Sequence, residues 1–231
     1  MPDIANFLSK VSVSAIPVIL AITFHEAAHG YVASKKGDPT AMMLGRVTLN
    51  PIPHIDLIGT ILLPGIMLLM GTGIVFGWAK PVPVNFRLLR DQKRDPIYVS
   101  AAGVVTNLGL AAVSGIVYRL LIAFLTNVQA EAMAGGVPAS SEMMFRGALF
   151  LASMCKVSVG INVLLAVFNM IPIPPLDGGR IAVGLLPPRA SMALASVERY
   201  GMLIVLVLLM FGPLGIIWHF VQAITSFFLG G

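Results

Sequence analysis

Residues 11–33 read VSVSAIPVILAITFHEAAHGYVA, an apolar run that carries His25, Glu26 and His29 near its end. The run is as long as the roughly 20 residues that a helix needs to cross the hydrocarbon core of a membrane. Placing one charged side chain at the centre of such a helix costs about 2.5–3.5 kcal/mol. Three ionisable side chains in this setting therefore indicate a functional site. We predict a membrane helix over residues 4–34 that holds this site.

The composition is that of an integral membrane protein. Of the 231 residues, 57% are hydrophobic and only 11% are charged, whereas soluble chains contain about 25% charged residues. The formal net charge of +5 needs no nucleic acid to explain it, because basic residues commonly flank membrane spans. We therefore expect one domain over residues 1–231 that is embedded in the lipid bilayer and has no nucleic-acid partner.

Further apolar segments predict an all-α polytopic fold with about four to six transmembrane helices. We expect a re-entrant segment and loop at 57–95, helices at 96–125 and 143–170, and a helix or helical hairpin at 200–229. The apolar part of the re-entrant segment, residues 57–70, has only 14 residues, which is short for a span. Pro64 and Gly65 should also interrupt it in the middle.

Lysine and arginine gather in three stretches, and the positive-inside rule places these stretches on the cytoplasmic face. The first stretch follows the first helix and contains Lys35, Lys36 and Arg46. The second precedes residues 96–125 and contains Lys80, Arg87, Arg90, Lys93 and Arg94. The third precedes the last segment and contains Arg180, Arg189 and Arg199. Residues 126–142 contain none, so this loop should lie outside. This arrangement requires residues 57–70 to enter and leave the membrane on the same side. Irregular backbone at membrane depth must be covered by protein or line a wet cavity, so this segment should border the site.

The H-E-x-x-H spacing predicts a metal site. Positions i and i+4 lie on one face of a helix, so the imidazoles of His25 and His29 can bind one tetrahedral ion, usually zinc. Glu26 lies beside them and could act as a general base toward a water molecule that the ion activates. The alternative is a chance match in a solvated helix, which the apolar surroundings make the weaker interpretation.

A catalytic zinc ion usually has three protein ligands, so the two histidines leave one ligand to be found. The remaining candidates are His54, Asp56, Asp177, Glu198 and His219. Asp177 is favoured because prolines before it stop the helix and glycines after it permit a tight turn. The predicted topology also puts this turn on the same membrane face as the histidines. The alternative role for Asp177 is a hydrogen-bonded turn at the membrane boundary.

Two stretches, FHEAAHG at 24–30 and PIPPLDGG at 172–179, together resemble the site-2 protease family of intramembrane zinc metallopeptidases. The stretches NP at 50–51, HID at 54–56 and GWAKPVPVN at 77–85 are also similar to short bacterial members of this family. In the next helix, AGVVTN at 102–107 keeps the family's glycine and asparagine but has Val104 in place of its proline. The local shape of this helix can therefore differ from that of the family.

The resemblance implies that His25, His29 and Asp177 bind one Zn2+ ion and that Glu26 is the general base. It also implies that the protein cleaves transmembrane protein substrates within or next to their membrane segments. Together with the charge bias, it predicts a site in the bacterial inner membrane that opens toward the cytoplasm. The alternative is a zinc-binding membrane protein without peptidase activity, such as a carrier or an inactive scaffold. Glu26 argues against this alternative, because a carrier needs ligands but no base beside them.

The resemblance gives residues 73–85 a role in handling the substrate, and residues 74–76 could add the edge of a strand to an extended peptide. A plain connecting loop is an equally open interpretation of this stretch. His54 could cap the cleft or support a ligand, although a solvated loop histidine is the favoured alternative. Asn107 or Asn169 could donate a hydrogen bond to the substrate oxyanion or orient a ligand, but membrane asparagines more often bond a neighbouring helix.

Overall fold

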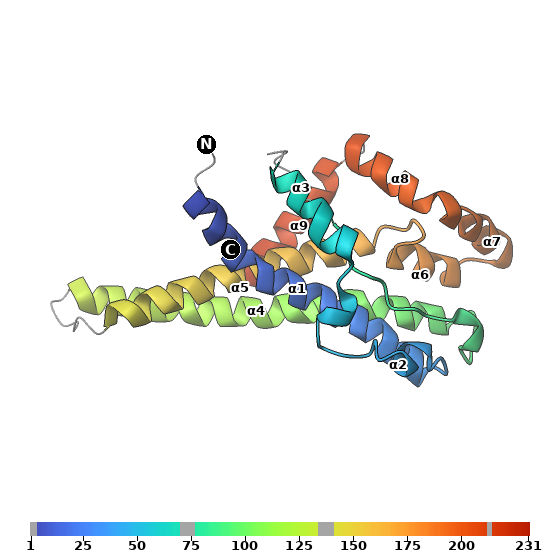
Figure 1. The fold of residues 1–231 in the computed structure, drawn as a ribbon, viewed down its shortest axis with the longest axis horizontal. Helices are drawn as coiled ribbons and strands as arrows, with labels where there is room; N and C mark the ends of the chain where they lie inside the picture. The colour runs from blue at the N-terminus through green and yellow to red at the C-terminus, as the bar shows by residue number, and fades with distance from the viewer. Residues whose placement is uncertain (1–3, 70–76, 134–140, 212–213) are drawn as a thin grey trace. The chain divides into compact units, whose positions relative to one another are not determined.

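The computed structural model describes residues 4–69, 77–133, 141–211 and 214–231, and within these ranges the chain is helical with no strand (Figure 1). The predicted all-α class is therefore confirmed for this part of the chain. The elements, in chain order, are α1 (Ile4–Lys35), α2 (Thr40–Met43), the 3-10 turn η1 (Ile52–His54), the π-helical turn η2 (Leu57–Leu62), α3 (Leu63–Leu69), the 3-10 turn η3 (Phe86–Leu88), α4 (Asp95–Met133), α5 (Ser141–Asn169), α6 (Asp177–Leu185), α7 (Pro188–Ser196), α8 (Glu198–Phe211) and α9 (Leu214–Leu229).

Three of the described helices are long and apolar enough to cross a membrane. They are Val11–Lys35 in α1, Asp95–Met133, which is the whole of α4, and Glu142–Asn169 in α5. The protein is therefore an integral membrane protein. Helix α4 continues past residue 125, where hydropathy predicts its end, because residues 126–133 contain neither proline nor glycine to stop a helix. Val104 lies within α4, which runs through it without a break.

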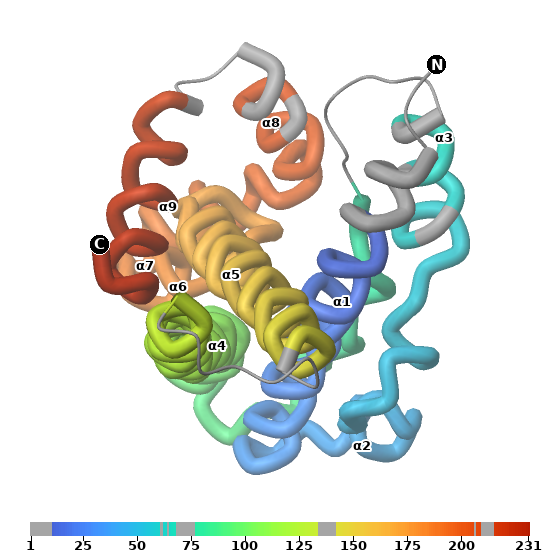
Figure 2. The backbone as a smooth tube through the Cα atoms, turned by 90° about the vertical axis from the view of Figure 1, so that its left-hand side faces the viewer, coloured from blue at the N-terminus to red at the C-terminus, as the bar shows by residue number. Residues whose placement is uncertain are grey.

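The chain divides into two compact units, of which the first comprises residues 1–21, 107–169 and 206–231. In this unit the second part of α4 runs antiparallel to α5, and the two helices lie side by side (Figure 2). At one end of this pair, small buried residues allow the two helices to pack closely. At the other end, Val221 of α9 packs against both helices. The prediction of a single domain over residues 1–231 stays a prediction.

The second unit comprises residues 22–106 and 170–205. Its core cluster joins Ala33 of α1, Leu89 of the loop before α4 and Val99 of α4, with Val84 and Phe86 packed against them. This cluster fixes the end of α1 against the beginning of α4. The three side chains of the predicted metal site all belong to this unit.

The segment predicted to be re-entrant is helical without the expected break at Pro64 and Gly65. The turn η2 leads directly into α3, which contains both residues. The expectation of an interruption is wrong because Pro64 lies in the first turn of α3, where a helix tolerates a residue without an amide donor. Residues 70–76, which include Gly71, Gly73 and the expected strand edge, lie outside the described residues.

Candidate metal centre

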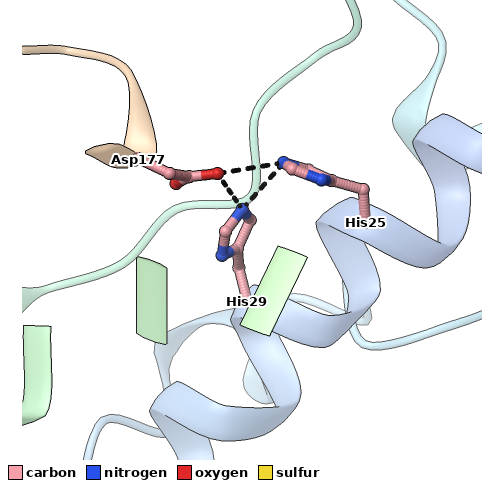
Figure 3. Close-up of side chains that lie close together, drawn as sticks. All are labelled: His25, His29 and Asp177. Carbon is pink, nitrogen blue, oxygen red and sulfur yellow. Dashed lines mark hydrogen bonds and ion pairs between the residues drawn. The ribbon is translucent and has the colours of Figure 1, made fainter. Parts of the chain in front are cut away.

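The two histidines of the H-E-x-x-H motif lie one helical turn apart on α1 and point in the same direction (Figure 3). Their Nε2 atoms are 3.0 Å apart, and their rings meet edge to face. Because the spacing of four residues is close to one helical turn, the sequence alone brings these two nitrogen atoms together. The chain therefore presents a pair of imidazoles within one membrane span.

Asp177 is the first residue of α6 and follows the turn at residues 170–176. Gly178 and Gly179 let this turn fold against the start of α6. A Cβ atom on Gly178 would collide with the carbonyl oxygen of Met170, and one on Gly179 would collide with the backbone nitrogen of Pro174. Glycine is the residue that tolerates such a close backbone approach. The turn thus delivers the Asp177 carboxylate to the histidine pair.

The three side chains surround a common point, as Figure 3 shows. Oδ2 of Asp177 lies 3.3 Å from Nε2 of His25 and 3.4 Å from Nε2 of His29. Zinc bonds of about 2.0–2.1 Å at tetrahedral angles place ligand atoms about 3.3–3.4 Å apart. The donor set and its spacing therefore fit a zinc ion. Asp177 and His25 are each only 7% exposed, so few water molecules can compete for these atoms.

A backbone carbonyl sets the proton position on one of the imidazoles. Nδ1 of His29 lies 2.7 Å from the carbonyl oxygen of Val99, to which its N–H donates. In the neutral ring this bond leaves the lone pair on Nε2, the atom that faces His25 and Asp177. Hydrogen bonds of this kind orient metal-binding histidines and make them more basic. The beginning of α4 thereby prepares His29 to bind a metal.

Gly103 of α4 forms one wall of the site. A Cβ atom at this position would lie 2.6 Å from Nε2 of His29 and 2.7 Å from Nε2 of His25. These are the two nitrogen atoms that face the common point, so a side chain here would enter the space that a metal ion needs. The absence of a side chain at Gly103 keeps that space open.

The Asp177 carboxylate is held in its charged form. Burial on its own raises the pKa of this group, but when His25 and His29 are protonated, their hydrogen bonds and charge more than offset burial and lower the pKa to about 2. An ionised carboxylate is the form that binds a metal ion.

Glu26 is held by the irregular chain that follows α3. Its Oε2 accepts a hydrogen bond of 2.7 Å from the backbone N–H of Val82. Val82 belongs to residues 73–85, to which the family resemblance gives a role in handling the substrate, so the structure brings part of this stretch to Glu26.

The other candidates for the third ligand have different partners. Asp56 caps the turn η2 by accepting hydrogen bonds from the amides of Ile58 and Gly59, and Glu198 pairs with Arg180 at 3.4 Å. His219 is exposed on α9. His54 is only 2% exposed, and its Nε2 lies 3.1 Å from the carbonyl oxygen of Thr48. The interpretation of His54 as a solvated loop histidine is therefore wrong; a supporting role stays a prediction.

The two asparagines bond to backbone and side chains of the first unit. Nδ2 of Asn107 donates to the carbonyl oxygen of Ala21 at 3.2 Å and to Oδ1 of Asn162 at 2.8 Å. Nδ2 of Asn169 donates to the carbonyl oxygen of Leu165 within its own helix. Sequence reasoning missed Asn162, although an asparagine in an apolar helix is itself a signal of a polar partner. A catalytic role for Asn107 or Asn169 stays a prediction.

Two imidazoles and a carboxylate with zinc-ligand spacing, next to a glutamate on a membrane span, are typical of membrane-embedded metallopeptidases. A family comparison agrees with this class. The chain belongs to peptidase family M50, the site-2 protease family, whose model matches residues 13–212. It is accordingly a zinc metalloendopeptidase, and Zn2+ is its cofactor.

Named relatives support the same class. The chain is 37% identical over 218 residues to "Putative zinc metalloprotease YwhC" of Bacillus subtilis, a match that covers 94% of this chain and 89% of the relative. It is 29% identical over 211 residues to "Putative zinc metalloprotease Rip2" of Mycolicibacterium smegmatis, covering 90% of this chain and 71% of the relative. No solved structure gives a significant match.

Proposed function

We propose that this protein hydrolyses peptide bonds within or next to the transmembrane segments of other membrane proteins. In this proposal His25, His29 and Asp177 hold the zinc ion, which when bound supplies Lewis-acid activation of water and of the scissile carbonyl. Glu26 accepts the proton that the attacking water loses and passes it to the leaving amine. The observation that carries the proposal is the spacing of the three ligand atoms, 3.0–3.4 Å, two of which lie on the membrane helix that also holds Glu26.

The segment at 57–95 is the part of the chain that we propose for holding the substrate. A transmembrane helix keeps its amides in backbone hydrogen bonds, so it must unwind locally before water can reach a carbonyl carbon. The hydrogen bond between Val82 and Glu26 supports this role, because it places the irregular stretch 77–85 against the proposed base. An unwound substrate segment lying along this stretch would pass the zinc ligands.

We further propose about four to six membrane spans, a re-entrant segment at 57–70, and a site that opens toward the cytoplasm of the bacterial inner membrane. Contacts between the end of α1 and the start of α4 support the re-entrant arrangement. The backbone N–H of Arg90 donates to the carbonyl oxygen of Lys36 at 3.0 Å, and Lys36 Nζ pairs with Asp95 at 3.0 Å. If α1 and α4 both cross the membrane, the chain leaves one span and enters the next at neighbouring points, which supports a return of the residues between them to the same face.

This topology predicts the labelling of single cysteines in intact cells. In a chain whose one native cysteine, Cys155, is replaced by alanine, cysteines at Lys35 and Arg90 should both resist a membrane-impermeant maleimide. A cysteine at Glu131, near the other end of α4, should react readily, because α4 is expected to cross the membrane. Permeabilised cells provide the control in which all three positions react. Labelling of Lys35 and Arg90 from opposite faces would overturn the re-entrant arrangement.

Metal removal tests the proposed function. Purified protein in lipid vesicles, supplied with a model transmembrane substrate, should lose cleavage on treatment with a chelator and regain it when zinc is returned. Asp177→Asn should lower bound zinc at least about tenfold and reduce cleavage in parallel, because a neutral amide is a far poorer zinc ligand than a carboxylate. Zinc per chain is measured by plasma mass spectrometry.

Full zinc occupancy in Asp177→Asn would show that another residue is the third ligand. Bound zinc without cleavage in the wild type would favour a carrier or scaffold.

A further inference from the structure

Arg46 is a buried arginine whose position is not explained by the zinc ligands or by membrane topology. The residue is only 8% exposed, and a buried charge is costly unless it is well hydrogen-bonded. Its guanidinium donates to the carbonyl oxygens of Lys80 and Pro81, at 2.7 and 3.3 Å. Within the described part of the chain its Nε has no partner. Arg46 is therefore used to hold two neighbouring carbonyl groups of one short stretch of backbone.

The same stretch of backbone holds Glu26. The carbonyl of Pro81 and the N–H of Val82 belong to one peptide unit, which is planar and, in its trans form, directs these two groups to opposite sides. Arg46 binds the carbonyl on one side of this unit, and the carboxylate of Glu26 accepts the N–H on the other side at 2.7 Å. One rigid peptide plane thus connects the guanidinium to the proposed general base.

The sequence of this stretch makes the Val82 amide a specific choice. Residues 81–83 are Pro-Val-Pro, so Val82 supplies the one backbone N–H in the tripeptide, and the prolines fix the φ angles on both sides. The Val82 side chain is buried, near the backbone of Gly30 on α1. The tripeptide therefore has a stiff backbone, a packed side chain and a single donor, which points at Glu26.

We propose that Arg46 is a positioning residue for the general base and acts through the Pro81–Val82 peptide. By fixing the carbonyl, Arg46 fixes the direction of the Val82 N–H, which in turn holds Oε2 of Glu26 and leaves Oε1 directed for proton transfer. A cation at the carbonyl also polarises the peptide, so the N–H becomes a stronger donor to the carboxylate. This inference rests on the proposed function, since it assigns Arg46 a part in the same cleavage reaction.

Replacing Arg46 by methionine should lower kcat for the model transmembrane substrate by about 10- to 100-fold, because a small displacement of a catalytic group is enough for such a loss. The zinc content should remain within about twofold of wild type, since Arg46 donates to the carbonyl oxygens of Lys80 and Pro81 and not to a zinc-binding side chain. Arg46→Lys should recover part of the lost kcat, because an ammonium group can still donate to a carbonyl oxygen.

Arg119→Met is the matched control, since it makes the same change at an arginine that binds a backbone carbonyl, that of Phe227, outside residues 57–95. Its kcat should stay within about twofold of wild type, because this bond lies in the first unit, whereas the 81–82 peptide and the zinc ligands lie in the second. A wild-type kcat in Arg46→Met would overturn the inference. So would a fall in zinc content as large as the fall in kcat, which would indicate a general structural role.

A second pair of variants tests the amide itself and does not depend on the folding of Arg46→Met. Val82→Pro removes the N–H that binds Glu26, whereas Val82→Ala shortens the side chain and keeps the N–H. Val82→Pro should have a kcat at least about tenfold below that of Val82→Ala at equal zinc content. Equal kcat values in the two variants would exclude the peptide connection. If the wild type itself cleaves no substrate, the proposed function fails and not merely this inference.

Discussion

Glu26→Gln is expected to abolish cleavage of a transmembrane substrate while leaving zinc bound. The substitution removes the proton acceptor but keeps the size of the side chain, and the amide oxygen can still accept the hydrogen bond from Val82. A positioned general base contributes about 10²- to 10⁴-fold to a rate, so kcat should fall by at least that factor. The measurements are the single-turnover cleavage rate in lipid vesicles and zinc per chain in the same preparation.

Glu142→Gln provides a matched control, because it makes the same chemical change at an exposed position. Glu142 pairs with Arg146 at 2.7 Å on the surface of α5, and exposed pairs of this kind contribute little to stability. Its cleavage rate should equal that of the wild type. An unchanged rate in Glu26→Gln would remove Glu26 from the mechanism. Loss of zinc in that variant would instead show that Glu26 supports the metal site.

The sequence predicts local features of the site well, because the physical causes are local. Residues four apart on a helix share a face, so His25 and His29 meet by helix geometry alone (Figure 3). The apolar run around them makes ionisable side chains costly and therefore informative. The turn at Asp177 is predictable in the same way, since the prolines before it restrict the backbone and the glycines after it permit a close approach. That His25, His29 and Asp177 bind zinc remains a proposal supported by their spacing.

Contacts between distant residues are the part that sequence patterns do not reveal. The amide of Val82 binds a side chain 56 positions earlier in the chain, and no local pattern tells which amide will reach Glu26. The charge bias predicts that Arg46 is one of several basic residues on the cytoplasmic face. Nothing in that pattern indicates that its side chain is buried. Hydropathy likewise marks where an apolar stretch ends, whereas α4 continues as a helix to Met133.

Gly103→Ala is expected to eliminate zinc binding and, with it, cleavage. The added methyl carbon would lie 2.5 Å from Cε1 of His25 and 2.6 Å from Nε2 of His29, so one of the rings must move. His29 has little freedom to do so, because its Nδ1 is bonded to the Val99 carbonyl one turn earlier on the same helix as Gly103. Loss of the ligand geometry should weaken zinc binding by about 100-fold, the upper end of the losses seen when groups that support a metal site are changed.

Gly109→Ala separates this effect from the general effect of alanine in a helix. Gly109 also lies within α4, and a Cβ atom there would have nothing within 4 Å. Alanine is favoured over glycine in a helix interior by about 0.5–1 kcal/mol, so Gly109→Ala should keep full zinc content and unfold at the same or a slightly higher temperature. Gly103→Ala gains the same helix propensity and should still lose zinc. If Gly103→Ala binds one zinc ion per chain with wild-type affinity, the metal does not occupy the space between Gly103 and the two imidazoles.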